Sequence, residues 1–270
     1  MITVARRLKQ SCYRLLTALF GDNNGVAVLP VLRGPAKGLW FGVRLANGEA
    51  AFVSGTYEPS TTKTIAEACN PGQIAWDCGT HIGFYTVILA RRVGPHGTVI
   101  AFEPDATNCI RTERNVALNG FANVTIVQKA VGAPLGMVSF HSTGDHVSHI
   151  EGTYVGHQGA AGVGDRRDGT AIMVECISPN EAIGRLGITS PDFIKFDLEG
   201  AEAGALAHMD AVVAATRPIM LVELHNQQCE QALFSFATKY DYRLQDALSG
   251  RNLPSLPLCS HVLCTPRRSG

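Results

Sequence analysis

Several features that mark common protein classes are missing from this sequence. Its 23 Lys and Arg residues are matched by 23 Asp and Glu residues, so it lacks the positive charge of a dedicated nucleic-acid-binding protein. No uninterrupted apolar run reaches the about 18 residues of a transmembrane helix. The eight cysteines form no C-x-x-C pair, which argues against a zinc site and favours buried thiols in a reducing compartment. We therefore expect a cytoplasmic protein that acts on a small molecule and not on nucleic acid.

The pattern along the 270 residues alternates between strands and helices. Strands are predicted at 73–77, 98–102, 123–127, 136–141, 171–176, 192–197 and 218–223, with terminal strands up to Cys264. Helices are predicted at 60–69, 83–92, from the cap Asp105 to Asn119, at 179–187, from about Ala201 and at 228–239. Strands of continuous apolar character that alternate with helices predict an α/β fold, with a doubly wound, mostly parallel sheet that binds its ligand at the carboxyl ends of the strands.

This domain is predicted to span residues 57–270, after an extension at residues 1–56 that holds an N-terminal helix and short strands at 26–57. Residues 142–169 are rich in Gly and His and show little periodicity. A segment of this length without regular structure is often a lid. We expect it to close over the substrate, with Ser148 and His149 near the acceptor.

The first 20 residues favour an amphipathic helix. Its apolar positions, such as Leu8, Leu15 and Leu19, lie mostly opposite Arg7 and Arg14. Such a helix can rest on an anionic membrane surface, or it can pack on its own domain or on a partner subunit of a homo-oligomer. The general rule that an amphipathic stripe faces a core favours packing. No small-residue cleavage site follows, so a secretory signal is not predicted.

The turn "WDCGTHIG" departs from the dinucleotide-binding pattern G-x-G-x-x-G. His81 stands at the position of the middle glycine, and Asp77 would repel a pyrophosphate. S-adenosylmethionine has no phosphate, and its ammonium group suits Asp77, directly or through water. Gly79 makes room for the cofactor. Glu103 ends the next strand, where a carboxylate can accept both hydroxyls of a ribose.

Six segments together resemble the FkbM family of methyltransferases: Tyr57-Glu58-Pro59, "WDCGTHIGFYTVILA", "GTVIAFEPD", "RNVALNGFANVTIVQKAVG", "DFIKFDLEGAE" and "RPIMLVELH". The resemblance covers about residues 55–226. It implies a class I, Rossmann-like methyltransferase fold, S-adenosylmethionine as cofactor, and O-methylation of small molecules such as sugars, glycolipids or polyketide-type metabolites. His81 stands where the family usually has Asn, and "ECISPNEAI" at 175–183 replaces a Leu-Asp-Asp-like segment. The expected cofactor-binding residues are Asp77, Gly79, Thr80, His81, Gly83, Phe84, Glu103, Pro104, Lys129, Ala130 and Asp197.

The acceptor is expected beside "FIKFDLEGAE" and "VELHN". Methyl transfer to a hydroxyl requires alignment of acceptor, methyl and sulfur, and either removal of the hydroxyl proton or coordination of the hydroxyl to a metal. Asp197, Glu199 and His225 are the candidate catalytic residues, and Glu199 and Glu202 are candidate substrate contacts. If strands 192–197 and 218–223 are neighbours, Asp197, Glu223 and His225 can hold Mg²⁺ or another divalent cation. Equally, His225 can be a general base with Glu223 or Glu199 orienting its ring.

Two other functions share part of this pattern. A nicotinamide oxidoreductase would have the same strand and helix order and would use Glu103 in the same way. The glycine turn argues against this function, because it does not match G-x-G-x-x-G. A member of the family that binds the cofactor without catalysing transfer would keep the whole pattern. Isothermal titration with S-adenosylmethionine, NAD and NADP distinguishes the first alternative, and turnover distinguishes the second.

Overall fold

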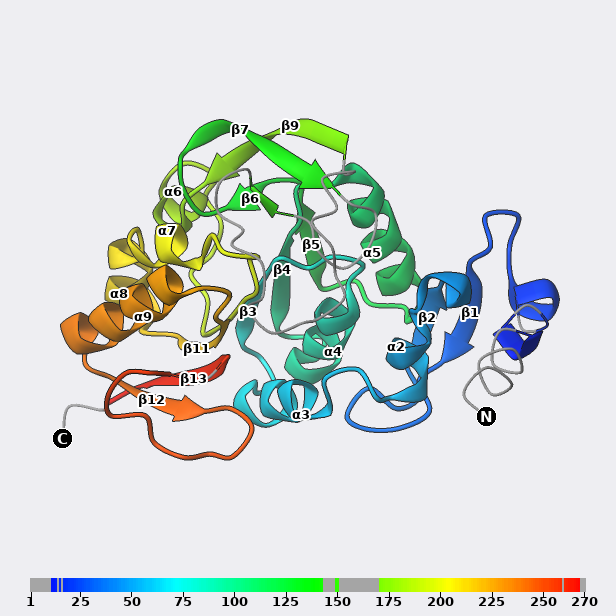
Figure 1. The fold of residues 1–270 in the computed structure, drawn as a ribbon, viewed down its shortest axis with the longest axis horizontal. Helices are drawn as coiled ribbons and strands as arrows, with labels where there is room; N and C mark the ends of the chain where they lie inside the picture. Colours follow the sequence, from blue (N-terminus) through cyan, green and yellow to red (C-terminus); the bar gives the residue numbers. More distant parts are fainter. Residues whose placement is uncertain are drawn as a thin grey trace.

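A seven-stranded sheet organises the molecule (Figure 1). The computed structural model describes residues 11–13, 15, 17–142, 149–150, 170–258 and 260–267. The order of the strands across the sheet is β12-β13-β11-β10-β3-β4-β5. Their bounds are β3 Ile74–Cys78, β4 Thr98–Phe102, β5 Val124–Val127, β10 Phe193–Phe196, β11 Ile219–Glu223, β12 Tyr242–Asp246 and β13 His261–Pro266. The five strands from β11 to β5 pair in parallel and β13 runs antiparallel to both of its neighbours, which confirms the mostly parallel α/β fold.

Helices cover both faces of this sheet, as a doubly wound fold requires. One face carries α3 (Pro59–Ala68), α4 (Phe84–Val93) and α5 (Ala106–Leu118), and the other carries α6 (Pro179–Gly184), α7 (Glu202–Leu206), α8 (Asp210–Thr216) and α9 (Gln227–Tyr240). Successive strand residues point to opposite faces of the sheet. Ala75 packs in the core with α4, whereas Trp76 packs in the core with α7 to α9. The chain therefore has the doubly wound α/β fold that the sequence predicted.

Local capping explains where several helices begin. The Asp105 side chain accepts hydrogen bonds from the backbone N–H groups of Thr107 and Asn108, as the sequence predicted for the start of α5. Ser178 and Glu181 form a reciprocal capping box at the start of α6. The helix predicted from Ala201 is two short helices, α7 and α8, separated by residues 207–209.

A second sheet of four strands packs beside the carboxyl end of β10. Its order is β6-β9-β7-β8, with bounds Ala130–Val131, Thr170–Ile177, Gly136–Ser142 and His149–Ile150. The sequence predicted β7 and β9 but not the two-residue strands. Phe140 and Ile150 are buried in a cluster with Ala201, so this sheet is fixed to the segment that follows β10. Residues 143–148 and 151–169, which include Ser148 and most of the expected lid, lie outside the described residues.

The extension before the main sheet holds a hairpin and a short helix. The strands β1 (Ala27–Pro30) and β2 (Trp40–Val43) are antiparallel, and a 3₁₀ turn, η1 (Leu45–Asn47), and α2 (Ala50–Ser54) follow. Only short strands were predicted over residues 26–57, so helix α2 corrects that prediction. The rings of Phe41 and Phe52 contact Phe84 of α4, which joins the extension to the core of the main sheet. Among the described helices, none is long and apolar enough to cross a membrane.

Candidate functional site

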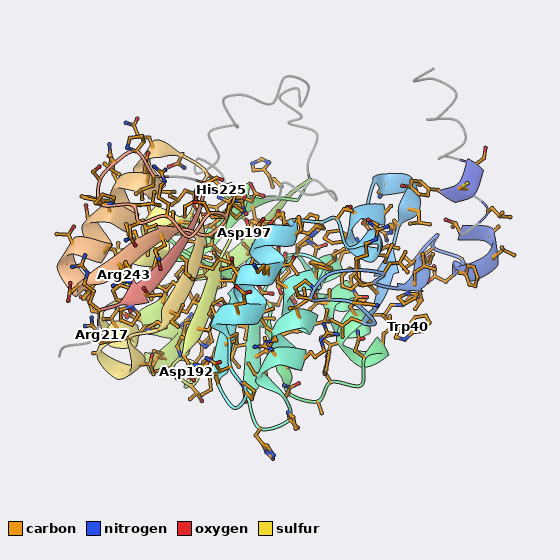
Figure 2. All side chains as sticks on the ribbon, turned by 90° about the horizontal axis from the view of Figure 1, so that it is seen from below. Trp40, Asp192, Asp197, Arg217, His225 and Arg243 are labelled. Atoms are coloured by element: carbon orange, nitrogen blue, oxygen red, sulfur yellow. The ribbon has the colours of Figure 1, made fainter. Side chains whose placement is uncertain are left out.

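A cavity of about 250 Å³ opens at the carboxyl ends of β3, β4, β10 and β11. This is the place that the parallel sheet predicted for a ligand. Figure 2 shows Asp197 and His225 at this end of the strands and Asp192 at the other. Ten of the expected site residues line the cavity: Gly79, His81, Glu103, Pro104, Lys129, Ala130, Asp197, Glu199, Glu223 and His225.

The turn between β3 and α4 forms one wall through its backbone. Gly79 has φ +84°, and a Cβ atom there would lie 1.8 Å from the backbone oxygen of Asp197. Only glycine fits such a contact without displacing the chain. Two strand ends therefore press directly against each other at the cavity wall.

Asp77 lies behind this turn and does not line the cavity. It is fully buried, and its Oδ2 atom accepts hydrogen bonds from the hydroxyls of Thr80 (2.7 Å) and Thr86 (2.6 Å). Its Oδ1 atom lies 3.8 Å from the ammonium group of Lys195. Strand alternation explains the difference from a direct cofactor contact, because Asp77 points to the same face as Ala75, towards α4. In the structure this carboxylate supports the turn, and its contact with the cofactor, directly or through water, stays a prediction.

Three further residues of the turn face inwards and do not line the cavity. The hydroxyl of Thr80 is used by Asp77. A Cβ atom on Gly83 would meet Thr112 at 2.8 Å, so this glycine serves helix packing. Phe84 is buried against the ring of Tyr57, at a centroid distance of 5.5 Å. In the structure these three residues support the turn, and their contacts with the cofactor stay predictions.

Glu103 lies at the end of β4 in the cavity wall and is 4% exposed. Its Oε2 atom accepts a hydrogen bond from the backbone N–H of His81 (2.8 Å), and Oε1 accepts one from that of Asp105 (2.9 Å). Burial raises the pKa of Glu103 to about 8, although these hydrogen bonds oppose the rise. The carboxylate therefore ties the β3–α4 turn to the loop after β4 and also faces the ligand space.

A group of carboxylates surrounds His225 at the other end of the cavity. The Nε2 atom of His225 lies 3.6 Å from Asp197 Oδ1, 3.5 Å from Glu199 Oε2 and 3.8 Å from Glu223 Oε1. The sequence predicted this meeting from the adjacency of the strands, and β10 and β11 are indeed paired. Asp197, Glu223 and His225 are close enough for their donor atoms to bind one cation.

Glu202 lies behind His225 and does not line the cavity. It is fully buried, and its Oε1 atom lies 2.8 Å from His225 Nδ1. It also accepts hydrogen bonds from the backbone N–H groups of Leu198 (2.8 Å) and Gly200 (3.1 Å). The first turn of α7 points Glu202 at the histidine, and its contact with substrate stays a prediction. The backbone of His149, the other expected contact, lies in β8, and its side chain is outside the described set.

The surrounding acids control the protonation of His225. Burial lowers its pKa, but the hydrogen bond with Glu202 and the charges of Glu202, Asp197 and Glu199 outweigh burial and raise the pKa to about 10. Burial and the charge of Asp197 raise the pKa of Glu199 to about 8. At neutral pH, His225 is therefore an imidazolium ion, and Glu199 titrates close to the working range of an enzyme.

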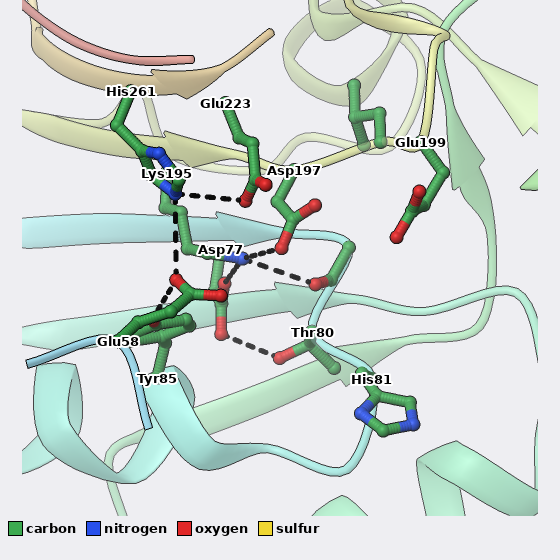
Figure 3. A network of polar contacts seen from close by, with 12 residues as sticks. Glu58, Asp77, Thr80, His81, Tyr85, Lys195, Asp197, Glu199, Glu223 and His261 are labelled. Carbon is green, nitrogen blue, oxygen red and sulfur yellow. Dashed lines mark hydrogen bonds and ion pairs between the residues drawn. The ribbon is translucent and has the colours of Figure 1, made fainter. Parts of the chain in front are cut away.

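A second polar network adjoins the first and was not predicted from the sequence (Figure 3). Lys195 donates a hydrogen bond to Asp197 Oδ2 (3.0 Å). His261 of β13 lies 3.4 Å from Glu223 Oε2 and 3.7 Å from Glu58 Oε2, and these three residues form a second group able to hold a cation. Glu58 also accepts a hydrogen bond from the hydroxyl of Tyr85 (2.6 Å). Tyr57 and Glu58 line the cavity, so the segment before α3 contributes to the site.

Unusual backbone conformations concentrate at the cavity. Five described non-glycine residues have positive φ angles, and three of them line the cavity: Glu58 (φ 36°), His81 (φ 50°) and Glu199 (φ 51°). The other two, Arg217 and Asp241, end helices, where this conformation is common. Such strain persists where the surrounding structure holds it, often at functional sites. No sequence pattern predicted it, because Glu and His rarely adopt this conformation.

Several solved structures share the arrangement of secondary structure at low sequence identity. An rRNA methylase from Streptococcus thermophilus is 11% identical, with a TM-score of 0.44, over 76% of this chain and 93% of the other. A SAM-dependent O-methyltransferase from Thermotoga maritima is 14% identical, with a TM-score of 0.43, over 79% of this chain and 68% of the other. Methyltransferase FkbM from Methylobacillus flagellatus is 14% identical, with a TM-score of 0.43, over 81% of this chain and 60% of the other.

No curated protein sequence matches this chain. The methyltransferase FkbM domain matches residues 77–244, more than half of the sequence, and this range includes the turn at Gly79, the acid Glu103 and the group around His225. The chain therefore belongs to the FkbM family of S-adenosylmethionine-dependent methyltransferases.

Proposed function

We propose that this methyltransferase transfers a methyl group to a hydroxyl oxygen of a small, uncharged molecule, such as a sugar, a glycolipid headgroup or a polyketide-type alcohol. The arrangement of Asp197, Glu199 and His225 around one end of the cavity carries the proposal. S-adenosylmethionine supplies the methyl group on a positively charged sulfur. The protein must hold the acceptor oxygen in line with that methyl group and receive the hydroxyl proton.

The cavity fits the cofactor at two points. The backbone of Gly79 lines the cavity without a side chain, because a Cβ atom at this position would collide with the backbone oxygen of Asp197. The buried Glu103 carboxyl group suits the two hydroxyls of a ribose, so it supports a nucleoside cofactor. Lys129 and Ala130 also line this end, where we expect the adenine ring. The carboxylate of Asp197, whose pKa the charge of Lys195 holds below its ordinary value, provides negative charge for a sulfonium ion.

The acidic residues at the His225 end of the cavity limit which kinds of acceptor molecule can bind there. Glu58, Asp197, Glu199 and Glu223 all line it, and carboxylates accept hydrogen bonds from hydroxyl groups. The cations nearby, Lys195 and His261, are already engaged by these acids. Because these cations are occupied, no free cation among the described lining residues is left at this end to bind a phosphate group, so a hydroxyl-bearing acceptor suits it better than a phosphorylated one or a nucleic acid. The acceptor is therefore proposed to be neutral.

Glu199 is the proposed proton acceptor. The imidazolium form of His225 has no free basic nitrogen, so it cannot take a proton at neutral pH. A carboxyl group with a pKa of about 8 retains basicity near neutral pH and becomes an effective base as the pH rises. His225 then orients Glu199 and Asp197 through its charge, while Glu202 fixes the ring from behind. This assignment replaces the interpretation of His225 as the base.

A divalent cation is the second candidate for hydroxyl activation. The donor atoms of Asp197, Glu223 and His225 lie within 4.8 Å of one another, and Glu202 holds the remaining nitrogen of His225 as a carboxylate often does behind a metal ligand. A bound Mg²⁺ or Mn²⁺ would supply positive charge to the acceptor oxygen. The protein would have to release the proton from His225 first.

The test uses methyl-labelled S-adenosylmethionine with a panel of neutral sugars, phenols and alcohols, their phosphorylated analogues, ribosomal RNA and an extract of the source cells. We expect label in a neutral product, with the carbon-13 shift of a methoxy group. Glu199→Gln should lower kcat by about 10²–10⁴ and leave cofactor affinity nearly unchanged. Transfer to nitrogen, carbon or RNA would refute the proposal. Cofactor binding without transfer to any of these would favour a catalytically silent protein.

A further inference from the structure

The N-terminal helical segment turns apolar side chains away from the protein. Residues 11–13, 15 and 17–20 are helical. Tyr13 packs against the core, and residue 17 is half-buried on the same side, one helical turn later. Leu15 and Leu19 also lie one turn apart, but on the opposite side, and are 60% and 65% exposed. Phe20 is 55% exposed. We call Leu15 and Leu19 the N-terminal apolar face.

The segment is attached to the molecule at its end and projects from it. Gly21 forms a bridge with Ala27 of β1, and Asp22 forms an ion pair of 2.6 Å with Arg114 of α5. Figure 1 shows the helical segment (blue) beyond the β1–β2 hairpin, at the end of the molecule opposite β12. The N-terminal apolar face is therefore held on the protein, yet no described element covers it. The expected packing on the protein's own domain holds for Tyr13 but not for Leu15 and Leu19, and packing on a partner subunit stays a prediction.

Charge distinguishes the possible occupants of this face. The first 21 residues contain four basic residues, Arg6, Arg7, Lys9 and Arg14, and no acid. Since the whole chain has 23 Lys and Arg and 23 Asp and Glu residues, the rest of it has 19 basic and 23 acidic residues. A second copy of the same segment would bring like charges together. An anionic lipid surface offers both the apolar phase and the negative charge that this composition suits.

We propose that the N-terminal apolar face docks onto an anionic lipid bilayer. Leu15 and Leu19 enter the boundary between headgroups and acyl chains, and the basic residues of the first 21 positions attract the anionic headgroups. Contact is peripheral, since no described helix is able to span a membrane. The proposal is independent of the methylation chemistry, because none of these residues lines the cavity.

The test is sedimentation of the full chain with vesicles of phosphatidylcholine alone or mixed with phosphatidylglycerol. We expect binding only to the anionic vesicles, weakened as salt rises from about 0.1 M to about 1 M. The double variant Leu15→Gln/Leu19→Gln should bind at least about tenfold more weakly. Leu248→Gln is the matched control, because Leu248 is 59% exposed and lies far along the chain. S-adenosylmethionine affinity, unchanged in both variants, verifies that they are folded.

Three results would overturn the proposal. The first is no binding, or equal binding to neutral and anionic vesicles. The second is anionic binding that the double variant retains. The third is a dimer in light scattering that the double variant converts to a monomer without any effect of lipid, which would assign this face to a second copy of the chain.

Discussion

Replacing Gly79 by alanine tests whether the contact between two strand ends builds the site. The added Cβ atom would lie 1.8 Å from the backbone oxygen of Asp197 and 2.9 Å from its carbonyl carbon. Ordinary contacts of this kind exceed about 3.4 Å, so one of the two backbones must move. Movement of either backbone displaces Gly79 or Asp197, and both residues line the cavity. The variant therefore combines a stability effect with an effect on the cofactor.

A matched variant isolates the collision from the backbone conformation. Gly48 has φ +86°, nearly the same as Gly79, but a Cβ atom there meets nothing within 4 Å. Gly48→Ala should cost only the left-handed conformation, about 1–2 kcal/mol. Gly79→Ala should cost the same amount and about 1–3 kcal/mol more for overpacking. The gain from a stiffer unfolded chain is alike in both variants and cancels in the comparison.

Urea denaturation and isothermal titration with S-adenosylmethionine provide the measurements. We expect Gly79→Ala to be the less stable variant and to lose at least about tenfold in cofactor affinity, while Gly48→Ala binds as the wild type does. Equal free energies of unfolding within about 0.5 kcal/mol, together with unchanged affinity, would refute the reasoning. The close approach of Gly79 to Asp197 would then be unimportant for the site.

Further predictions concern charge at the cavity. Glu103→Gln should weaken S-adenosylmethionine binding by about 1.5–3 kcal/mol in titration calorimetry, because a carboxyl oxygen that can accept a hydrogen bond from a ribose hydroxyl is lost. Unchanged affinity would show that Glu103 does not hold the ribose. Glu202→Gln should lower the pKa of His225 by about 1–2 pH units in an NMR titration, whereas Glu67→Gln, on an exposed helix surface, should not change it. EDTA should leave turnover intact if Glu199 is the base. If a metal acts, EDTA should abolish turnover, Mn²⁺ should restore it, and Asp197→Asn should be nearly as damaging as Asp197→Ala. The free energy of unfolding of the ligand-free protein should fall between about pH 7 and pH 10. Folding raises the pKa of His225 from 6.5 to about 10 and that of Glu199 from 4.5 to about 8, so the folded state binds protons more tightly. The stability that each group contributes is complete below its ordinary pKa and is lost as the pH rises through its folded-state pKa. Stability that rises over this range would contradict the assigned protonation states.

The sequence predicted most of the fold because strand and helix periods are local properties. All seven predicted strands of the main and second sheets were found, and β10 and β11 are neighbours as the metal hypothesis required. The short strands β6 and β8 were missed because two residues carry no period. Helix α2 was missed because its five residues lie in a segment read as short strands.

Side-chain direction limited the prediction of the site. Asp77 and Glu103 both come at the end of a strand, yet Glu103 follows the last strand residue and reaches the cavity, whereas Asp77 precedes it and points to α4. Relative to the end of its strand, Glu103 lies two residues further along than Asp77, so it stands beyond β4 whereas Asp77 is still inside β3. Strand ends predicted to within one or two residues cannot resolve this difference. Glu202 shows the same limit on a helix.

The residues that were missed altogether come from distant parts of the chain. Glu58 precedes α3, and His261 lies on the last strand, where β13 runs antiparallel beside β11 and brings His261 opposite Glu223. This pairing depends on strand order, which no local pattern determines. Its consequence is chemical: Glu223 is shared between His225 and His261, so the protonation of either histidine changes the charge that the other experiences. The acceptor end of the cavity therefore titrates as one unit, and substitution of Glu223 should alter the pKa of both histidines together.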